Sequence, residues 1–346
     1  MAEQREITAA GPLLDEKGEL RLPGYSKRMV QQYRRADVKG GPLRLKEWDY
    51  YCVNNGRFAL ALTVADNSYM GLDSISLLNL EEGWEVTKSP MQFMTRGKKA
   101  LPESSARGDV HSAGKGYSLH FLHLGSRRTL IAQMADFGPA GPLAARVELT
   151  EEPEESMVIA TPFPKRGHFY YNQKINCLRA SGYVTYDGRT YAFDPADSFA
   201  VLDWGRGVWT YKNTWYWSSA SGVTETGEVF GFNLGYGFGD TSAASENMLF
   251  CNGLAHKLGQ VRFLIPGEAE GKPRFTEPWR VTDEEGRLAL DFVPALDRKS
   301  CTDIKLIKSD QHQVFGRFTG RAVLDDGREI QLKDFPGFAE KVCNKW

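Results

Sequence analysis

The 346-residue sequence has no excess of charge of either sign. It has 43 Lys and Arg against 44 Asp and Glu, a formal net charge of -1 at pH 7. We expect no nucleic-acid partner, because nucleic-acid-binding proteins carry a basic surface. The sequence also lacks an apolar run of about 20 residues, so it predicts no membrane span. The first residues, Met1 to Gly11, have no signal-peptide core, which predicts that the chain is not secreted.

Cysteine is scarce and dispersed. The five cysteines are Cys52, Cys177, Cys251, Cys301 and Cys343, and none forms a Cys-x-x-Cys pair. This pattern argues against a zinc site and a disulfide framework, and it predicts a cytoplasmic location. The usual phosphate-loop, dinucleotide, zinc-protease and serine-hydrolase motifs are absent too. We therefore expect no metal and no cofactor.

Long helical periodicity is also nearly absent. Aromatic residues make up 12% of the chain, and there are 35 glycines, a combination typical of short strands joined by tight turns. Turn dipeptides recur between apolar runs, for example Asn55-Gly56, Asp187-Gly188 and Asn252-Gly253. The sequence therefore predicts an all-β fold of successive antiparallel hairpins.

A domain boundary is predicted in the acidic and proline-containing stretch from Glu151 to Arg166. Pro162 and Pro164 cannot lie in a central strand, so strand pairing should pause there. We predict one β-barrel over residues 11–160 and a second, with an aromatic pocket, over residues 166–346. The basic segment from Lys27 to Lys46 is either a solvated linker or a contact with an anionic surface.

Two aromatic-rich strands of the second half indicate where a site could lie. Alternation along residues 168–177 places Tyr170, Asn172, Lys174 and Asn176 on one face, which faces either solvent or a wet cavity. The next strand places Trp209, Trp215 and Trp217 on one face. These tryptophans either fill a core or form the wall of a ligand site.

A third strand, residues 229–239, pairs an aromatic face with a face of glycines that includes Asn233. A bare face lets a ligand or bulky side chains approach the backbone, and we expect Trp215 and Trp217 to fill that space. Glu246 is a weaker candidate that can reach the same region. In the first half, the stretch Trp48-Asp49-Tyr50-Tyr51 can contribute from across a domain interface.

Asp203 is the candidate catalytic residue. It ends the apolar run from Phe199 to Leu202 and precedes Trp204 and Arg206. Burial in an aromatic cavity would raise its pKa and make it an acid, whereas pairing with Arg206 would keep it a structural anion. Both interpretations remain open from the sequence.

Three strings in the second half resemble a known family. Residues 164–176 (PKRGHFYYNQKIN), residues 200–209 (AVLDWGRGVW) and Glu246-Asn247 with His256-Lys257-Leu258 resemble the microbial family called domain of unknown function 2804. More remotely, the Asp-to-Trp-Gly element is similar to the carotenoid 1,2-hydratase and AttH-like superfamily. That similarity implies two consecutive lipocalin-like β-barrels and includes hydratases and cyclases of apolar molecules.

We accordingly predict a cofactor-free protein that binds an apolar, isoprenoid- or lipid-like small molecule. Asp203 would protonate an alkene, and Trp204, Trp209, Trp215 or Trp217 would stabilise the cation. Hydration, isomerisation and cyclisation are all compatible with that chemistry. A non-catalytic carrier of lipid or pigment needs the same cavity without a tuned acid. A carbohydrate-active protein is a third alternative, because tryptophan platforms with Asn, Asp and Lys also suit sugars.

Overall fold

The chain is built almost entirely from β-strands. The structure, a computed structural model, describes residues 4–304 and 307–345. Within those ranges, the helical structure consists of one 3-10 turn, η1 (Arg35–Asp37). The described part of the chain also contains no helix with both the length and the apolar character needed to cross a bilayer.

The larger sheet has 14 strands and takes up most of the first 208 residues. Its central pairing order is β7-β6-β5-β4-β16-β14-β12-β11-β10-β9, with four short or branching strands attached. In chain order, the strands are β2 (Gly24–Ser26), β4 (Lys46–Asn54), β5 (Phe58–Asp66), β6 (Met70–Asn79), β7 (Trp84–Lys88), β8 (Met91–Phe93), β9 (Val110–Gly114), β10 (Tyr117–Leu124), β11 (Arg127–Gly138), β12 (Gly141–Thr150), β13 (Met157–Pro162), β14 (Phe169–Tyr186), β15 (Arg189–Phe193) and β16 (Phe199–Val208).

The smaller sheet has nine strands in the order β20-β19-β18-β17-β25-β24-β23-β22-β21. In chain order, they are β17 (Lys212–Val223), β18 (Val229–Tyr236), β19 (Met248–Cys251), β20 (Leu254–Lys257), β21 (Val261–Leu264), β22 (Trp279–Asp283), β23 (Leu288–Ile304), β24 (Ile307–Val323) and β25 (Glu329–Lys345). A separate parallel pair near the N-terminus joins β1 (Gly11–Pro12) to β3 (Gln31–Gln32).

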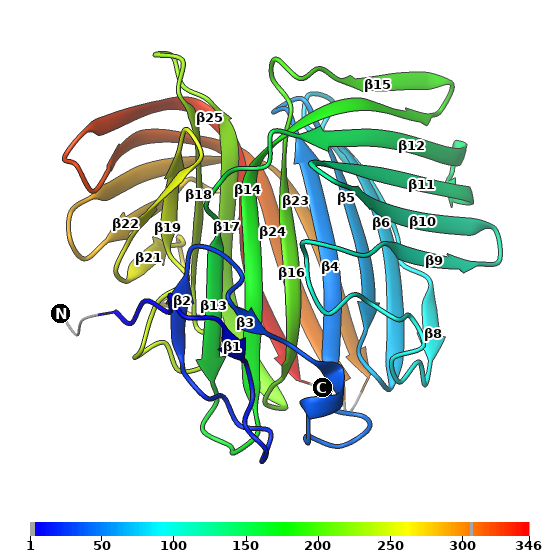
Figure 1. The fold of residues 1–346 in the computed structure, drawn as a ribbon. Helices are drawn as coiled ribbons and strands as arrows, with labels where there is room; N and C mark the ends of the chain where they lie inside the picture. Colours follow the sequence, from blue (N-terminus) through cyan, green and yellow to red (C-terminus); the bar gives the residue numbers. More distant parts are fainter. Residues whose placement is uncertain (1–3, 305–306, 346) are drawn as a thin grey trace.

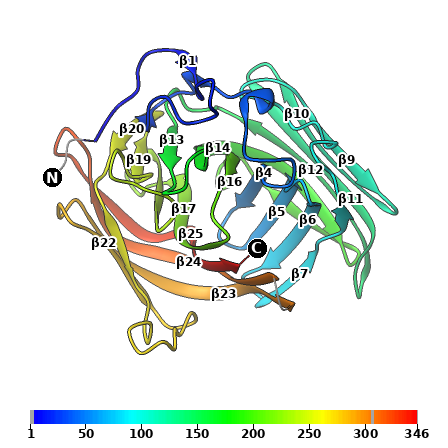
Figure 2. The same ribbon diagram turned by 90° about the horizontal axis from the view of Figure 1, so that it is seen from below.

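Each large sheet curls into a half-barrel, and the two half-barrels stand side by side (Figures 1 and 2). The predicted all-β fold of two consecutive lipocalin-like units is confirmed. The strands change sheet in the connection between Val208 and Lys212. Pairing does pause at residues 163–168, as expected, but β13 and β14 then form a hairpin across that turn. The division into domains at 11–160 and 166–346 stays a prediction.

Strand β14 joins the two halves of the larger sheet and has a β-bulge in its middle. Its first part pairs with β16 and its second part with β12, and the β16 register shifts between Ile175 and Leu178. Cys177, inside that shift, has a left-handed φ of 62°, which is the local geometry of a β-bulge. The bulge directs residues 169–176 toward the smaller sheet.

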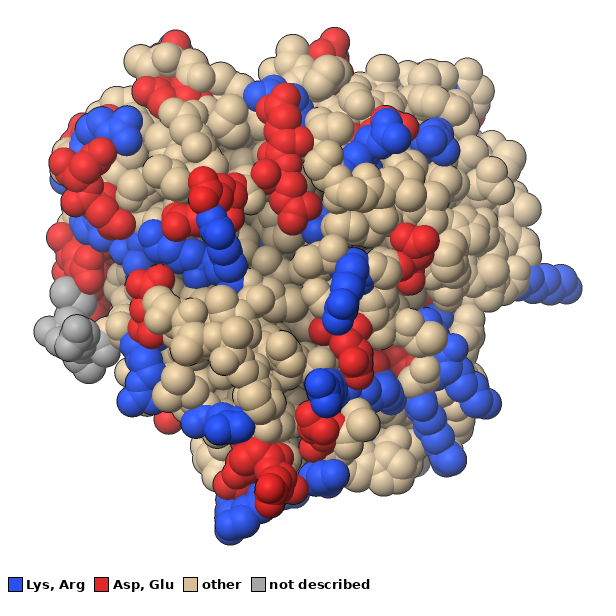
Figure 3. Space-filling model, viewed as in Figure 1, with Lys and Arg blue, Asp and Glu red and all other residues tan. Residues whose placement is uncertain are grey.

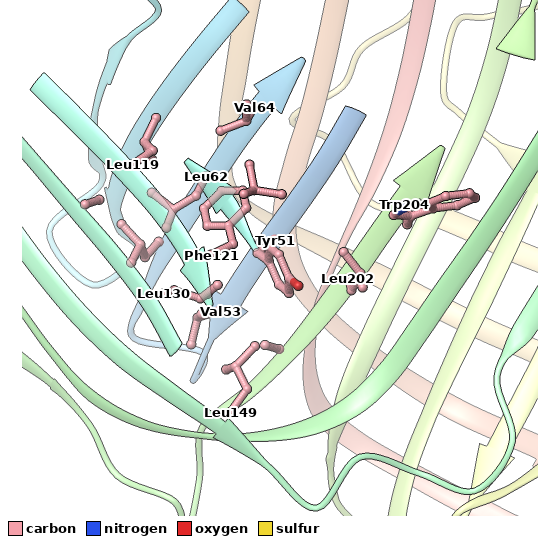
Figure 4. Packing of buried hydrophobic residues seen from close by; sticks show 14 of the residues in the cluster. Tyr51, Val53, Leu62, Val64, Leu119, Phe121, Leu130, Leu149, Leu202 and Trp204 are labelled. Carbon is pink, nitrogen blue, oxygen red and sulfur yellow. The ribbon is translucent and has the colours of Figure 1, made fainter. Parts of the chain in front are cut away.

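Side chains alternate between the inside of each half-barrel and the space between the sheets. The inner core of the larger sheet includes Tyr51, Phe121, Leu202 and Trp204 (Figure 4). A second core fills the smaller half-barrel. Two further apolar clusters contain residues of both sheets, such as Tyr50 and Val201 with Trp217 and Phe338. The sheets therefore pack on each other through their outer faces.

Candidate functional site

A cavity of about 220 Å³ lies between the two sheets. Trp48 and Tyr50 of β4 and Lys174 of β14 line it from the larger sheet, and Trp215 of β17 and Glu340 of β25 line it from the smaller sheet. Most of its lining residues come from the second half of the chain, where the aromatic pocket is expected. Trp48 and Tyr50 belong to the first-half stretch that we expect to contribute from across a domain interface.

The alternation along β14 and β16 explains which residues reach the cavity. Tyr170 and Lys174 share one face of β14, and Asp203 on β16 pairs in register with Lys174. The neighbouring residues on the opposite faces, Tyr171 and Trp204, lie in the core of the larger half-barrel. The predicted polar face of β14 is therefore buried between the sheets and does not face solvent.

One side of the cavity is an aromatic wall. Trp48 stacks on Tyr170 with ring centroids 6.0 Å apart and meets Trp209 edge-on at 5.2 Å. Phe238 contacts Tyr170, Trp209 and Trp215 at 4.8, 5.4 and 5.3 Å. The wall is held by edge-to-face contacts, which fix ring positions better than apolar contact alone. It offers flat apolar surface to a ligand.

Asp203 lies in the cavity as a member of an ion pair. Its Oδ2 is 2.7 Å from Lys174 Nζ, and its Oδ1 accepts a 2.6 Å hydrogen bond from Asn172 Nδ2. Lys174 Nζ also lies 3.7 Å from the Trp217 ring centroid. Of the two interpretations left open for Asp203, pairing with Arg206 is wrong, since Lys174 is the cation beside Asp203 and Arg206 pairs with Asp49.

The three candidate asparagines are buried beside the cavity and anchor other groups. Asn172 also donates to the Trp204 carbonyl oxygen at 2.9 Å, and Asn176 donates to Ser219 Oγ at 2.8 Å across the sheet interface. Asn233 accepts from Trp217 Nε1 at 2.7 Å. These amides hold the polar wall in place and do not line the cavity.

Glu340, on the last strand, is the carboxyl group in the cavity that sequence analysis missed. It accepts hydrogen bonds from Trp215 Nε1 at 2.8 Å and from Gln313 Nε2 at 2.9 Å. Burial raises the pKa of Glu340 to about 7, although Trp215, Lys174 and Arg298 act in the opposite direction. The available sign was alternation, which places Glu340 between Phe338 and Val342 on one face of β25.

Glu246 also lines the cavity, and burial raises its pKa as well. Gly235 leaves the space for it, because a β-carbon there would lie 2.5 Å from Glu246 Oε1. At Gly231, a β-carbon would meet Cys177 Sγ at 2.6 Å. Glu246 and Cys177 thus cover part of the glycine face. Trp217, which pairs in register with Gly235, also reaches this face, where its Nε1 donates to Asn233.

Two predicted site residues, Trp204 and Arg206, do not line the cavity. Both lie on the inner face of β16 and are completely buried. Arg206 donates to Asp49 Oδ1 at 2.9 Å and to the Pro102 carbonyl at 2.8 Å, and its guanidinium lies 4.1 Å from the Trp204 ring centroid. Their contacts are those of a structural network.

Across the described ranges, no group of three or more His, Cys, Asp or Glu is arranged to hold a metal ion. All five cysteines are free thiols. The chemistry available in the cavity is that of two buried carboxyl groups, one buried ion pair and an aromatic wall. Such a site can bind an apolar molecule and move a proton.

Comparisons with known proteins agree with the fold and the resemblance. A family model described as "Domain of unknown function (DUF2804)" matches residues 4–346, which confirms the resemblance noted in the sequence. No curated protein sequence matches the chain.

The solved structures that match the chain include three proteins. CghA, solved with Sch210972, has a TM-score of 0.55 at 10% identity over 97% of both chains. Kievitone hydratase from Nectria haematococca has a TM-score of 0.47 at 13% identity over 96% of this chain and 98% of its own. A putative AttH from Nitrosomonas europaea has a TM-score of 0.47 at 11% identity over 91% and 98%.

Proposed function

The chain belongs to the family described as domain of unknown function (DUF2804), and from that premise we propose that it binds an apolar, isoprenoid- or polyene-like molecule between its sheets and transforms it by acid catalysis. One observation carries the proposal. A carboxyl group with a pKa of about 7, Glu340, faces the same cavity as the aromatic wall. A general acid works best when its pKa lies near the working pH.

The proposed step is protonation of a carbon–carbon double bond. The O–H bond of Glu340 breaks as a C–H bond forms, and the electron pair of the double bond leaves a cation on the adjacent carbon. Loss of a different proton to the Glu340 carboxylate gives an isomer. Capture by water, with return of one water proton to Glu340, gives a hydrate. Attack by a second double bond forms a ring and leaves the positive charge on a carbon of that second bond, and loss of a proton from this cyclic cation to the Glu340 carboxylate gives the neutral product.

The aromatic wall supports the cation in this proposal. Lys174 already lies over Trp217, so a second cation beside that ring would be repelled. Trp209 likewise has Lys46 Nζ 5.2 Å from its ring centroid. Trp48 and Trp215, which form other parts of the wall, are the rings left to stabilise the cation. A cation over a desolvated tryptophan face gains about 2 kcal/mol.

We assign the proton to Glu340 and a positioning role to Asp203. Asp203 uses both oxygens as acceptors, from Lys174 and from Asn172, so its contacts suit an anion. It holds the Lys174 ammonium in the cavity, and that positive charge lowers the pKa of Glu340 against the larger effect of burial. The Asp203 carboxylate itself raises the pKa of Glu340, so its proposed role is to position Lys174, and Lys174 is the partner that counters burial.

The proposal is tested by titrating the full chain with fatty acids, isoprenoids and polyenes. We expect ligand binding to quench tryptophan fluorescence, because four tryptophans line the cavity. Products are then examined by mass spectrometry for isomers or for the gain of one water. Binding without turnover would favour the carrier, and a response to soluble sugars alone would favour the carbohydrate-active alternative. Either result would contradict the proposal.

A further inference from the structure

An apolar and basic segment protrudes beside the cavity. Met91, Phe93 and Met94, at and just after β8, have exposed fractions of 58%, 81% and 43%. Lys88, Arg96 and Lys98 around them are exposed. The stretch from 88 to 100 contains no acidic residue. Exposed apolar residues grouped in this way usually mark a contact surface.

This segment is fixed to the rim of the cavity. Strand β8 pairs with β6 from Met70 to Leu72, and Leu72 lines the cavity. The amide of Met94 donates to the Tyr69 carbonyl at 2.8 Å. Asp66 holds the following turn, accepting from Thr95 Oγ1 and the Gly97 amide, each at 2.8 Å. The exposed side chains are therefore presented on a braced loop.

A second basic segment lies against the first. Gly97 packs on the guanidinium of Arg35, and the loop from 41 to 45 is held by a 2.6 Å hydrogen bond from Ser68 Oγ to the Leu45 carbonyl. This region adds exposed Arg34, Lys39 and Leu43. Figure 3 shows Lys and Arg side chains gathered where Figure 1 places β8 and η1. We call residues 34–44 and 88–98 the rim segments.

Two acidic residues near the rim segments are Glu103 and Asp37, and Glu103 already accepts a hydrogen bond. Glu103 accepts a 2.8 Å hydrogen bond from the Arg35 amide, and Asp37 lies within η1. Arg35 itself pairs with Glu47. Lys88, Arg96 and Lys98 flank the exposed apolar side chains in the same stretch of chain, and Arg34 adds positive charge from the neighbouring segment. Lys39 lies against Gly18, in a turn that also carries Asp15, Glu16 and Glu19.

We propose that the rim segments dock the protein on an anionic lipid bilayer. Apolar side chains that enter the interface, flanked by cations that meet anionic headgroups, are the two contributions that hold a protein on such a surface. The position at the cavity rim would let an apolar molecule pass from the bilayer without crossing water. A protein partner is disfavoured because charge of one sign surrounds only four exposed apolar side chains, a small area for a stable protein interface.

The test is co-sedimentation of the full chain with vesicles of phosphatidylcholine, with and without phosphatidylglycerol. We expect binding only to the anionic vesicles, and weaker binding at high salt because salt screens exposed charges. Phe93→Ser should lower the partition coefficient about tenfold, since a phenyl ring leaving water contributes that much. The double variant Arg96→Gln, Lys98→Gln should lower it about 25-fold, at about fivefold per cation.

Matched variants on the other sheet serve as controls. Leu264→Ser removes an exposed apolar side chain, and Lys272→Gln with Arg280→Gln removes two exposed cations; we expect vesicle binding to be unchanged in both. The proposal would be overturned if the protein sedimented with neither vesicle, or if the variants and the controls lost vesicle binding equally. A protein partner would then be the alternative occupant of the rim segments. No cavity ligand is added, so the result is independent of the proposed reaction.

Discussion

Replacing Glu340 with glutamine should change how stability depends on pH. Burial raises the pKa of Glu340 from 4.5 to about 7. Between those pH values the folded protein holds a proton that the unfolded chain has released, so its free energy of unfolding falls as pH rises. A shift of about 2.5 pKa units corresponds to about 3 kcal/mol, at 1.36 kcal/mol per unit.

Glutamine has the shape of a protonated glutamic acid but cannot ionise. At pH 5 we expect Glu340→Gln to be less stable than the parent protein by about 1 to 3 kcal/mol, because the amide NH2 cannot accept one of the hydrogen bonds from Trp215 and Gln313. Between pH 5 and pH 8 the stability of the variant relative to the parent should rise by about 2 to 3 kcal/mol, because only the parent loses the stability that the raised pKa provides. Urea denaturation followed by fluorescence at several pH values between 5 and 8 measures this difference.

Burial also shifts the pKa values of other groups. Burial raises the pKa of Glu246, and burial lowers the pKa values of Lys46 and Lys257 to about 7. They contribute to both proteins alike and cancel in the difference between them. Glu329→Gln, on the exposed part of the same strand, is the matched control and should leave the slope unchanged. Identical pH slopes for Glu340→Gln and the parent would refute the reasoning.

Three further changes test the surroundings of the site. Asp203→Asn should lower stability by about 3 kcal/mol, because it leaves the buried Lys174 ammonium without its anion. An unchanged melting temperature would show that the ion pair does not stabilise the folded protein. Gly235→Ala should cost about 1 to 3 kcal/mol, because the new methyl group displaces the Glu246 carboxylate, and an undisturbed ligand affinity would place Glu246 outside the site. Arg206→Met should lower the free energy of unfolding, measured by chemical denaturation, by about 3 to 5 kcal/mol, while bound ligand still quenches tryptophan fluorescence. Loss of this quenching in a folded variant would show that Arg206 contributes to the ligand site.

The fold class could be read from the sequence because hairpins are local. Turns such as Asn55-Gly56 and Asp187-Gly188 connect β4 to β5 and β14 to β15, as expected. Alternation also separates the two faces of β14 as far as the bulge at Cys177, which packs with Tyr170 between the sheets and not with Tyr171 as predicted. Period-two patterns depend only on neighbouring residues, so they can be recognised without knowledge of the tertiary structure.

The sequence could not predict which side chains of distant strands meet in the cavity. Nothing local tells which face of β16 turns to the second sheet, so Asp203 and Trp204 looked equally available. Arg206 was close to Asp203 in the chain, yet Lys174 reaches it through strand pairing. Glu340 enters the cavity because β25 pairs with β17, a contact between residues more than 100 positions apart. A contact at that separation leaves no mark on local periodicity.

The central claim is that Glu340 delivers a proton to carbon in the cavity between the sheets. The most direct measurement is incubation of each ligand that quenches fluorescence in deuterated water near neutral pH, followed by mass spectrometry of the recovered ligand. We predict deuterium bound to carbon with the parent protein and a loss of about 10²- to 10⁴-fold in its rate of incorporation with Glu340→Gln. Deuterium incorporation at the parent rate in Glu340→Gln, or none in any bound ligand, would contradict it.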